Sequence, residues 1–123
     1  MTTETQDHTT FDLDGMRDAL HAWDVDALMR HYAEDVEFRQ IDQTTPPSAP
    51  QVVRGRDAVE QMFRAVAARG IETRIVDVIA GDGRYALAVA CRIPGGGAVY
   101  DHTFLDLRDG LIVRQAAVAA WDA

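Results

Sequence analysis

Three stretches of the chain carry apolar residues at the three- and four-residue spacing of an amphipathic helix. The first lies within residues 11–23. Asp24 is placed to cap a second, short helix, whose apolar stripe extends to Tyr32 and Ala33. A third helix is predicted over residues 56–69, and its inner face is expected to carry Ala58, Val59, Met62, Phe63 and Val66.

The pattern changes after Gly70 to the strict alternation that is typical of β-strands. The connections between the alternating segments are short and rich in glycine, as β-hairpins require, so an antiparallel meander is expected. A shorter strand is predicted earlier, around Val36 to Gln40, and the prolines within residues 43–51 indicate a loop over the mouth of a pocket. The four later strands are predicted over residues 71–80, 84–93, 98–107 and 111–121.

Alternation divides each long strand into two faces, which differ in the size of their side chains. The face with the larger groups is expected to close over the helices and to line a cavity. It comprises Tyr85, Leu87, Val89, Cys91, Ile93, Val99, Asp101, Thr103, Leu105, Leu107, Leu111, Val113, Gln115, Ala117, Ala119 and Trp121.

The opposite face carries mostly small side chains and is too apolar for a face that meets water. We therefore expect a second copy of the chain to pack there, forming a homodimer through the sheets. The alternative is a monomer with an alanine-rich outer face. This set comprises Ala86, Ala88, Ala90, Tyr100, His102, Phe104, Ala116, Val118 and Ala120.

Helices followed by a sheet predict an α+β domain, in which a curved antiparallel sheet packs on three helices and encloses an apolar pocket. The chain has 123 residues, which is the size of one domain. Residues 1–10 are polar and have nothing to bury, so they are expected to form a flexible tail before a single domain over residues 11–123.

Charge and composition narrow the possible partners. The net charge is −8, with the arginines scattered, which argues against nucleic acid and anionic membranes as partners. No apolar run approaches a membrane span, and the acidic start is unlike a secretory signal, so a cytoplasmic protein is expected. The single cysteine, Cys91, is interpreted as a small buried hydrophobe rather than a reactive thiol.

Several local strings resemble the SnoaL-like polyketide cyclases and the ketosteroid isomerases of the nuclear-transport-factor-2 superfamily. They are ALHAWDVDAL at 19–28, YAEDVEF at 32–38, VRGRDAV at 53–59 and LRDGLIV at 107–113. The resemblance spans nearly the whole chain and implies a cone-shaped fold with a pocket for a small hydrophobic organic molecule. These strings form turns and the starts of elements, so they specify the fold more than the reaction.

The isomerase resemblance implies an aspartate base and an oxyanion site built from a tyrosine and a protonated aspartate. In this chain the tyrosine position falls on Met16 and the base position on Gln40, and neither can perform that proton chemistry. The pocket-acid region falls on Asp101 or Thr103. Asp101 is therefore the best candidate for a general acid/base, because an apolar cavity raises the pKa of a carboxyl group.

Other residues are assigned supporting roles. Tyr32 matches a pocket aromatic of the isomerases and is a candidate to hold an enolate oxygen, with His102 as a further catalytic candidate. Asp101 and His102 have opposite parity, so both can face the cavity only if a bulge intervenes. Substrate contacts are expected from Met16, Trp23, Gln40, Phe63, Thr103, Leu105, Gln115 and Trp121.

The leading hypothesis is a cyclase or isomerase that needs no cofactor and acts on a polyketide-like or related carbonyl compound. No metal site is expected, because His21 and His31 face away from the apolar stripes and His8 lies in the tail. The alternative is a binding or dimerisation module of the same fold, in which Asp101 is an exposed carboxylate or forms an inner salt bridge to Arg54 or Arg92. A minor alternative is an epoxide hydrolase or epoxide-opening cyclase, which would need an Asp-Arg-Asp cluster such as Asp101, Arg92 and Asp106.

Overall fold

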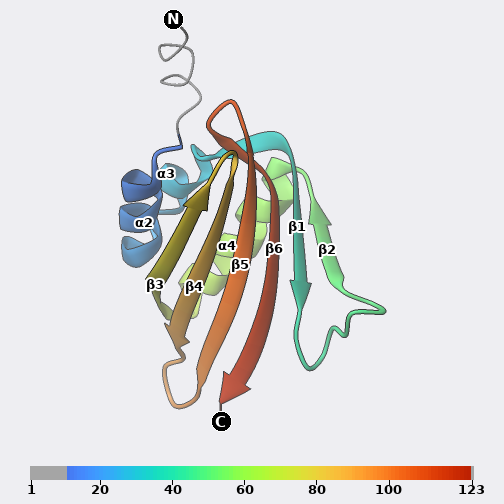
Figure 1. Cartoon of the computed structure of the whole chain (residues 1–123). Coiled ribbons are helices and arrows are strands. Elements are labelled where there is room, and N and C mark those ends of the chain that lie inside the picture. The colour runs from blue at the N-terminus through green and yellow to red at the C-terminus, as the bar shows by residue number, and fades with distance from the viewer. Residues whose placement is uncertain (1–10, 123) are drawn as a thin grey trace, which may run out of the picture.

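The computed structural model describes residues 11–122, so the tail predicted for residues 1–10, which includes His8, lies outside the described residues. One sheet with the strand order β2-β1-β6-β5-β4-β3 forms the body of the molecule (Figure 1). Its strands are β1 (Tyr32–Ile41), β2 (Gln51–Arg54), β3 (Glu72–Gly81), β4 (Arg84–Arg92), β5 (Ala98–Arg108) and β6 (Leu111–Asp122).

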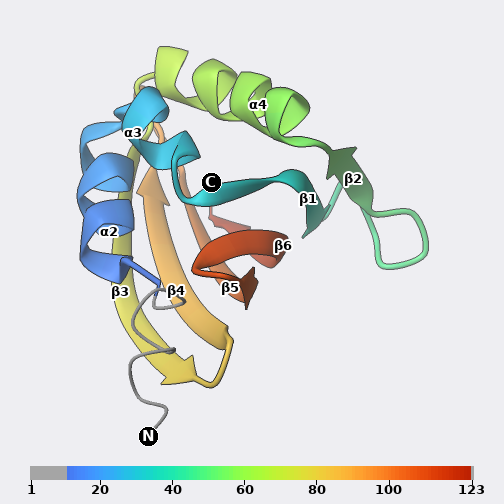
Figure 2. The same ribbon diagram turned by 90° about the horizontal axis from the view of Figure 1, so that it is seen from above.

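The three helices are α2 (Leu13–Ala22), α3 (Val25–Met29) and α4 (Arg56–Ala68). The sheet is strongly curved, with α2 packed beside β3 and α4 across β1 and β2 (Figure 2). The predicted α+β cone and the antiparallel meander from β3 to β6 are therefore confirmed. Within residues 11–122, no helix is both long and apolar enough to cross a membrane.

The helical hairpin is stabilised by side chains that the sequence places at its ends. Asp12 and Asp24 each accept a backbone hydrogen bond in the first turn of α2 and α3. Trp23, between the helices, has a φ of 51° and donates its indole N–H to the Ile71 carbonyl at 2.7 Å. His21 Nε2 accepts the Ile75 backbone N–H at 3.1 Å, so this histidine joins α2 to β3.

The prediction that Tyr32 and Ala33 extend the second helix is wrong, because β1 begins at Tyr32. Tyr32 pairs with Ile112 of β6 in parallel, and the register then shifts before Glu37. This irregularity buries Tyr32, Ala33 and Val36 together. Their spacing therefore imitates a helical stripe although the backbone is extended.

Strand β2 was not predicted, since it has only four residues and follows the prolines of the preceding loop. It pairs with β1 in antiparallel fashion, with Phe38 opposite Val53. It leads directly into α4, whose predicted inner face is confirmed at Val59 and Phe63, both buried. Ala58 is exposed, so its assignment to the inner face is wrong.

The predicted faces of β6 are correct for Gln115 and the residues after it, and wrong at the start of the strand. Leu107 pairs with Ile112 while Asp106 pairs with Arg114, so Val113 is an extra residue on β6. This bulge reverses the parity, and Ile112 is fully buried in place of Leu111 and Val113.

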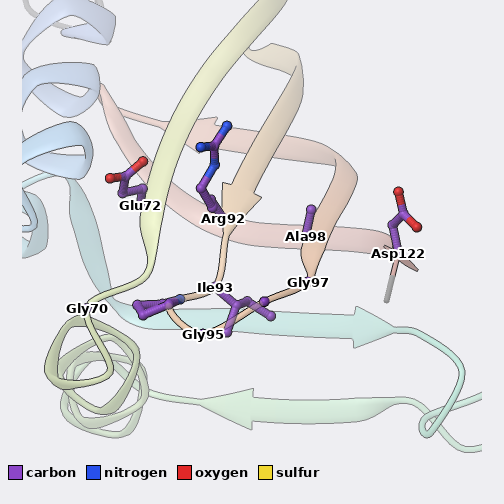
Figure 3. A pocket seen from close by; sticks show the side chains of 10 residues that line it. Gly70, Glu72, Arg92, Ile93, Gly95, Gly97, Ala98 and Asp122 are labelled. Atoms are coloured by element: carbon purple, nitrogen blue, oxygen red, sulfur yellow. The ribbon is translucent and has the colours of Figure 1, made fainter.

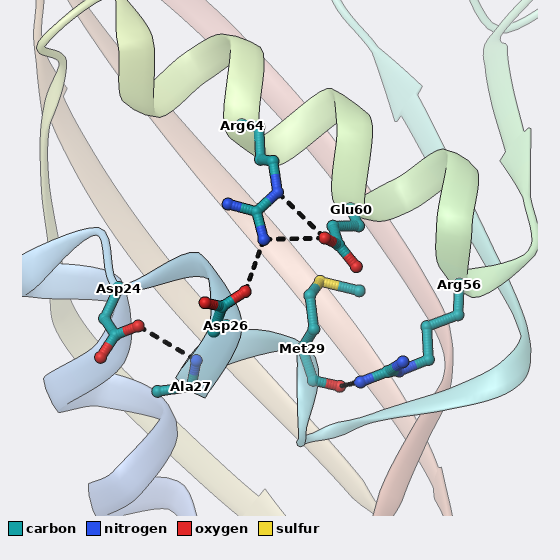
Figure 4. A network of polar contacts seen from close by, with 7 residues as sticks. All are labelled: Asp24, Asp26, Ala27, Met29, Arg56, Glu60 and Arg64. Carbon is teal, nitrogen blue, oxygen red and sulfur yellow. Dashed lines mark hydrogen bonds and ion pairs between the residues drawn. The ribbon is translucent and has the colours of Figure 1, made fainter.

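The end of α3 is tied to the start of α4 by one arginine. The Arg56 guanidinium donates two hydrogen bonds to the Met29 carbonyl, at 2.9 and 3.0 Å, which satisfies a carbonyl left free at the helix end (Figure 4). Arg64, two turns further along α4, pairs instead with Glu60 and Asp26 at the surface. The two arginines therefore have different environments on the same helix.

We expect Arg56→Met to lower the free energy of unfolding by about 1–3 kcal/mol, because the Met29 carbonyl loses a charged donor. Arg64→Met, a matched control, should cost less than about 1 kcal/mol, since exposed ion pairs contribute little. Urea denaturation of both variants measures the difference. Equal losses would show that Arg56 is no more than another surface cation.

Candidate active site

A cavity of about 270 Å³ lies between the concave face of the sheet and the helices. Its wall is mostly apolar, with a few polar groups that converge on the interior. Inward positions of β4, β5 and β6 supply Leu87, Val89, Cys91, Val99, Asp101, Thr103, Gln115, Ala117, Ala119 and Trp121. The helices and the remaining segments add Met16, Leu20, Trp23, Tyr32, Phe38, Gln40, Gln51, Met62, Phe63, Val66, Arg69, Ile71, Thr73 and Ile93.

A larger depression of about 570 Å³ lies outside the cone, beside the glycine-rich turn between β4 and β5 (Figure 3). Glu72, Arg92 and Asp122 border it, and all three are exposed. Its walls offer no buried polar group, and water already surrounds the charged side chains. The smaller interior cavity is therefore the candidate active site, because apolar walls with a few directed polar groups are typical of ligand sites.

The pairing of β5 with β6 shows which end of the cavity is open and which is buried. Val99 lies opposite Trp121, and the next inward pair along β5 and β6 is Asp101 and Ala119. Two further inward positions along β6 lead to Gln115, which lies opposite Leu105. Trp121 is half exposed and Gln115 is buried, so the cavity deepens along β6 from Trp121 towards Gln115.

Asp101 is half-buried and is the only carboxyl group among the described residues that line the cavity. Thr103 Oγ1 donates a hydrogen bond to Asp101 Oδ1 at 2.7 Å. Burial raises the pKa of the Asp101 carboxyl above its ordinary value, and the Thr103 hydrogen bond and the nearby His102 oppose that shift only in part. No ion pair involving Asp101 occurs within residues 11–122, and Arg54 pairs with Glu37 instead.

The structure places His102 on the opposite side of the sheet from Asp101. His102 is exposed and lies edge-on to the Tyr100 ring, with 5.4 Å between the ring centroids. No bulge interrupts β5 between the two residues, so their opposite parity is preserved. His102 therefore does not reach the cavity.

Tyr32 and Gln115 form a polar pair at the deep end of the cavity. Tyr32 Oη donates to Gln115 Oε1 at 2.5 Å, and the two residues are only 3% and 9% exposed. Burial raises the pKa of the Tyr32 hydroxyl well above its usual value, so the phenol stays protonated and remains a donor.

Cys91 is half-buried and lines the cavity, so the prediction of a buried hydrophobe is only partly met. Its Sγ lies 3.6 Å from Thr73 Oγ1. Burial raises the pKa of the thiol, and the charge of Asp101 acts in the same direction, so the neutral form is favoured. Thr73 was not identified beforehand, although its inward parity on the first long strand could have indicated it.

Seven of the eight predicted substrate contacts line the cavity. Leu105 does not, because it is completely buried in the core. Gln40 lines the cavity, but its amide Nε2 donates to Asp42 Oδ2 at 3.2 Å. Of the predicted loop over residues 43–51, only Gln51, the first residue of β2, lines the cavity. The seven lining residues are Met16, Trp23, Gln40, Phe63, Thr103, Gln115 and Trp121.

Schiff-base chemistry and epoxide hydrolysis would each need residues that this cavity does not contain. The chain contains no lysine, so no lysine Schiff base can form with a carbonyl substrate. Arg92 does not line the cavity, and Asp106 pairs with Arg84 at 2.6 Å, so the cluster required for an epoxide hydrolase is not assembled. Within the described part of the chain, no group of three or more histidine, cysteine or acidic residues is arranged to hold a metal ion.

A curved sheet wrapped around a helix-covered cavity defines the nuclear-transport-factor-2-like class of folds. The chain belongs to the SnoaL-like domain family, whose model matches residues 13–115. A comparison of this sequence with curated proteins found no match.

Solved structures support the same fold. An NTF2-like protein of unknown function from Mesorhizobium loti is 19% identical and has a TM-score of 0.76, with 97% of this chain and 93% of that chain covered. A candidate ketosteroid isomerase from Kribbella flavida is 19% identical, with a TM-score of 0.69 and coverage of 89% and 74%. A candidate polyketide cyclase from Sinorhizobium meliloti is 18% identical, with a TM-score of 0.65 and coverage of 85% and 91%. At these identities the likeness shows the fold alone.

We expect the pKa of Asp101 to lie above the value of about 3.9 found for an unperturbed aspartate. Thr103→Val should raise this pKa further, because it removes a hydrogen bond that stabilises the carboxylate. Carbon-detected NMR titration of the Asp101 carboxyl measures both values. Asp42 is an internal reference: its burial favours the neutral form, but hydrogen bonds from Thr44 and Thr45 hold its pKa at about 2.

An Asp101 that titrates at its ordinary value in both proteins would contradict the geometry described above. A shift of the Asp42 titration in Thr103→Val would show that the substitution disturbs the protein generally rather than Asp101 alone.

Proposed function

We propose that the chain is a cyclase or isomerase that uses no cofactor and acts by general acid–base catalysis on a small hydrophobic carbonyl compound. The observation that carries this proposal is the position of Asp101, a half-buried carboxyl group that faces an otherwise largely apolar cavity. Its raised pKa makes the Asp101 carboxylate a stronger base than that of an ordinary aspartate, so it accepts a proton more readily. The names given to two structural neighbours, an isomerase and a polyketide cyclase, support the same class.

In this mechanism the Asp101 carboxylate removes a proton from a carbon that a carbonyl group acidifies. The electron pair of that C–H bond moves into the conjugated system, and the carbonyl oxygen becomes an enolate oxygen. In an isomerisation the protonated Asp101 returns the proton to another carbon. In a cyclisation the enolate carbon attacks a second carbonyl, and the proton goes to the alkoxide that forms. Thr103 holds the carboxyl group in one orientation through its hydrogen bond.

The size of the cavity limits the substrate. A volume of about 270 Å³ lies just below the usual range for ligand sites, which favours compounds of one or two rings. The wall contributes one basic side chain, Arg69, which is exposed at the end of α4. Most of the substrate surface would therefore meet apolar groups.

Asp101→Asn should abolish proton transfer, because an amide cannot accept the proton while its shape is preserved. A suitable probe is octalone, a fused bicyclic enone, incubated in D₂O and followed by NMR for exchange of its acidic C–H positions. We expect the wild type to accelerate exchange and Asp101→Asn to lose roughly 10²- to 10⁴-fold of that rate.

Asp106→Asn is the matched control, since Asp106 lies outside the cavity, and its exchange rate should stay within about twofold of the wild type. The rival hypothesis is a module that binds ligands without catalysis. It would be favoured if the wild type binds octalone and yet exchanges its protons no faster than Asp101→Asn.

We further propose that two copies pack through the outer faces of their sheets, in a cytoplasmic homodimer. Large apolar side chains are exposed on neighbouring strands of this face: Tyr100 is 46% exposed, and Phe104 and Val118 are each 56% exposed. Ala86 and Ala116 lie opposite Phe104 on the two neighbouring strands, so small apolar side chains surround the exposed ring. Burying such a face against a second copy removes apolar surface from water.

Phe104→Glu should convert the dimer to a monomer, because it would place a charge within the apolar contact. Sedimentation equilibrium measures the mass of each protein. Ala58→Glu introduces the same charge on the exposed side of α4 and should leave the mass unchanged. A wild type that sediments as a monomer at all concentrations would refute the dimer and leave the catalytic proposal intact.

A further inference from the structure

The hydrogen bond between Tyr32 and Gln115 leaves one part of the Gln115 amide uncommitted. The phenol donates to Oε1, so both N–H groups of Nε2 are available to another acceptor. Among the described residues, no protein group accepts a hydrogen bond from this nitrogen. Gln115 lines the cavity, so a molecule in the cavity is the acceptor that these N–H groups can reach.

The side chains beside Gln115 in the sheet are apolar, so they offer no alternative acceptor to its amide N–H groups. Leu105, Phe38 and Ala117 flank it on and across the strands, and none of them carries a polar side chain. The Tyr32 ring packs against the Phe63 ring, with 5.6 Å between the ring centroids. A polar group in such an environment favours a ligand that supplies its missing hydrogen bond.

We propose that the Gln115 amide Nε2 binds the carbonyl oxygen of the substrate, and that Tyr32 is a positioning residue that fixes the amide in this orientation. This inference rests on the proposed function and deepens it. It also changes the role first suggested for Tyr32, because a phenol that donates to Gln115 is not free to donate to an enolate oxygen.

Two further glutamines, Gln40 and Gln51, line the cavity, and Gln40 provides a contrast. Gln40 lies near the open end of β1, and its Nε2 already donates to Asp42. One N–H group of the Gln40 amide is therefore engaged by the protein, whereas neither N–H group of Gln115 has a protein acceptor among the described residues.

The position of Gln115 also limits the shape of the substrate. It lies four residues along β6 from Ala119, the partner of Asp101, which corresponds to about 13 Å of strand. This geometry favours an elongated cyclic carbonyl compound, whose conjugation carries the charge from the reacting carbon to the oxygen.

Binding of two matched probes tests the assignment of Gln115. The ketone β-acetylnaphthalene offers a carbonyl oxygen, and β-ethylnaphthalene has nearly the same shape without an acceptor. We expect Gln115→Met to reduce the preference for the ketone, measured as the ratio of the two Kd values, by about five- to tenfold. Gln61→Met, a matched control on the exposed side of α4 and outside the cavity, should change this ratio by less than about twofold.

The hydrocarbon serves as the folding control, because it binds only if the cavity is intact. Should Gln115→Met weaken both probes equally, or neither of them, Gln115 is not the carbonyl donor. If Gln115→Met does not bind the hydrocarbon, Gln115→Leu takes its place, and the same change in the ratio of the two Kd values is expected.

The role of Tyr32 needs a signal that a loss of stability would not change. The C=O stretching frequency of the bound ketone falls when its oxygen accepts a hydrogen bond, so we expect a lower value in the wild type than in water-free solvent. In Tyr32→Phe we expect the C=O stretching frequency to rise part of the way towards its value in the solvent, because the Gln115 amide is no longer held in one orientation. An identical frequency in both proteins would overturn the positioning role.

Ketone preference tests the Gln115 site, and proton exchange tests the proposed catalysis, so the two can fail separately. Asp101→Asn should keep the full preference for the ketone while losing exchange, because Asp101 does not bind the carbonyl. A protein that shows the ketone preference without exchange supports the Gln115 site and refutes catalysis. Exchange that persists unchanged in Gln115→Met refutes the Gln115 site and leaves the proposed function standing.

Discussion

The parallel pairing of β1 with β6 is the constraint on which the cavity depends. It joins the first part of the chain to the last strand of the meander and brings Tyr32 against Gln115, residues 83 positions apart. Without this pairing, the concave face of β3 to β6 would be an open half-shell. With it, β2 and α4 follow directly and cover the remaining side.

Most of the fold could be predicted from periodicity, because helices and hairpin strands leave strong local signals. The exceptions are places where tertiary pairing breaks the local pattern. A bulge in β1 gave Tyr32, Ala33 and Val36 a helical spacing, and a bulge at Val113 reversed the faces at the start of β6. Bulges are set by the partner strand, so a single sequence carries little sign of them.

The candidate site was predicted in part for the same reason. Parity on an uninterrupted strand placed Asp101 and Thr103 inside and His102 outside, as the structure has them. Which atoms are bonded to each other could not be predicted, because it depends on segments that meet only after folding. The direction of the Tyr32 to Gln115 hydrogen bond and the engagement of Gln40 by Asp42 are both of this kind.

The polar groups of the cavity have a cost in stability. The native pKa of Asp101 is raised, so the native state binds its proton more tightly than the unfolded state does. The free energy of unfolding contributed by this group is therefore highest below its unfolded pKa and falls as the pH rises towards its native pKa. At neutral pH the Asp101 carboxylate therefore opposes folding.

Strand β5 serves two surfaces at once. Asp101, Thr103 and Leu105 face inwards, while His102 and Phe104 between them face outwards. Point substitutions on β5 can therefore change the cavity lining and the outer face separately, because alternate residues face opposite sides of the sheet. The insertion or deletion of a single residue within this strand would exchange the two sets, placing Phe104 inside and Asp101 outside. The length of β5 is consequently under a stricter constraint than the identity of almost any residue in it.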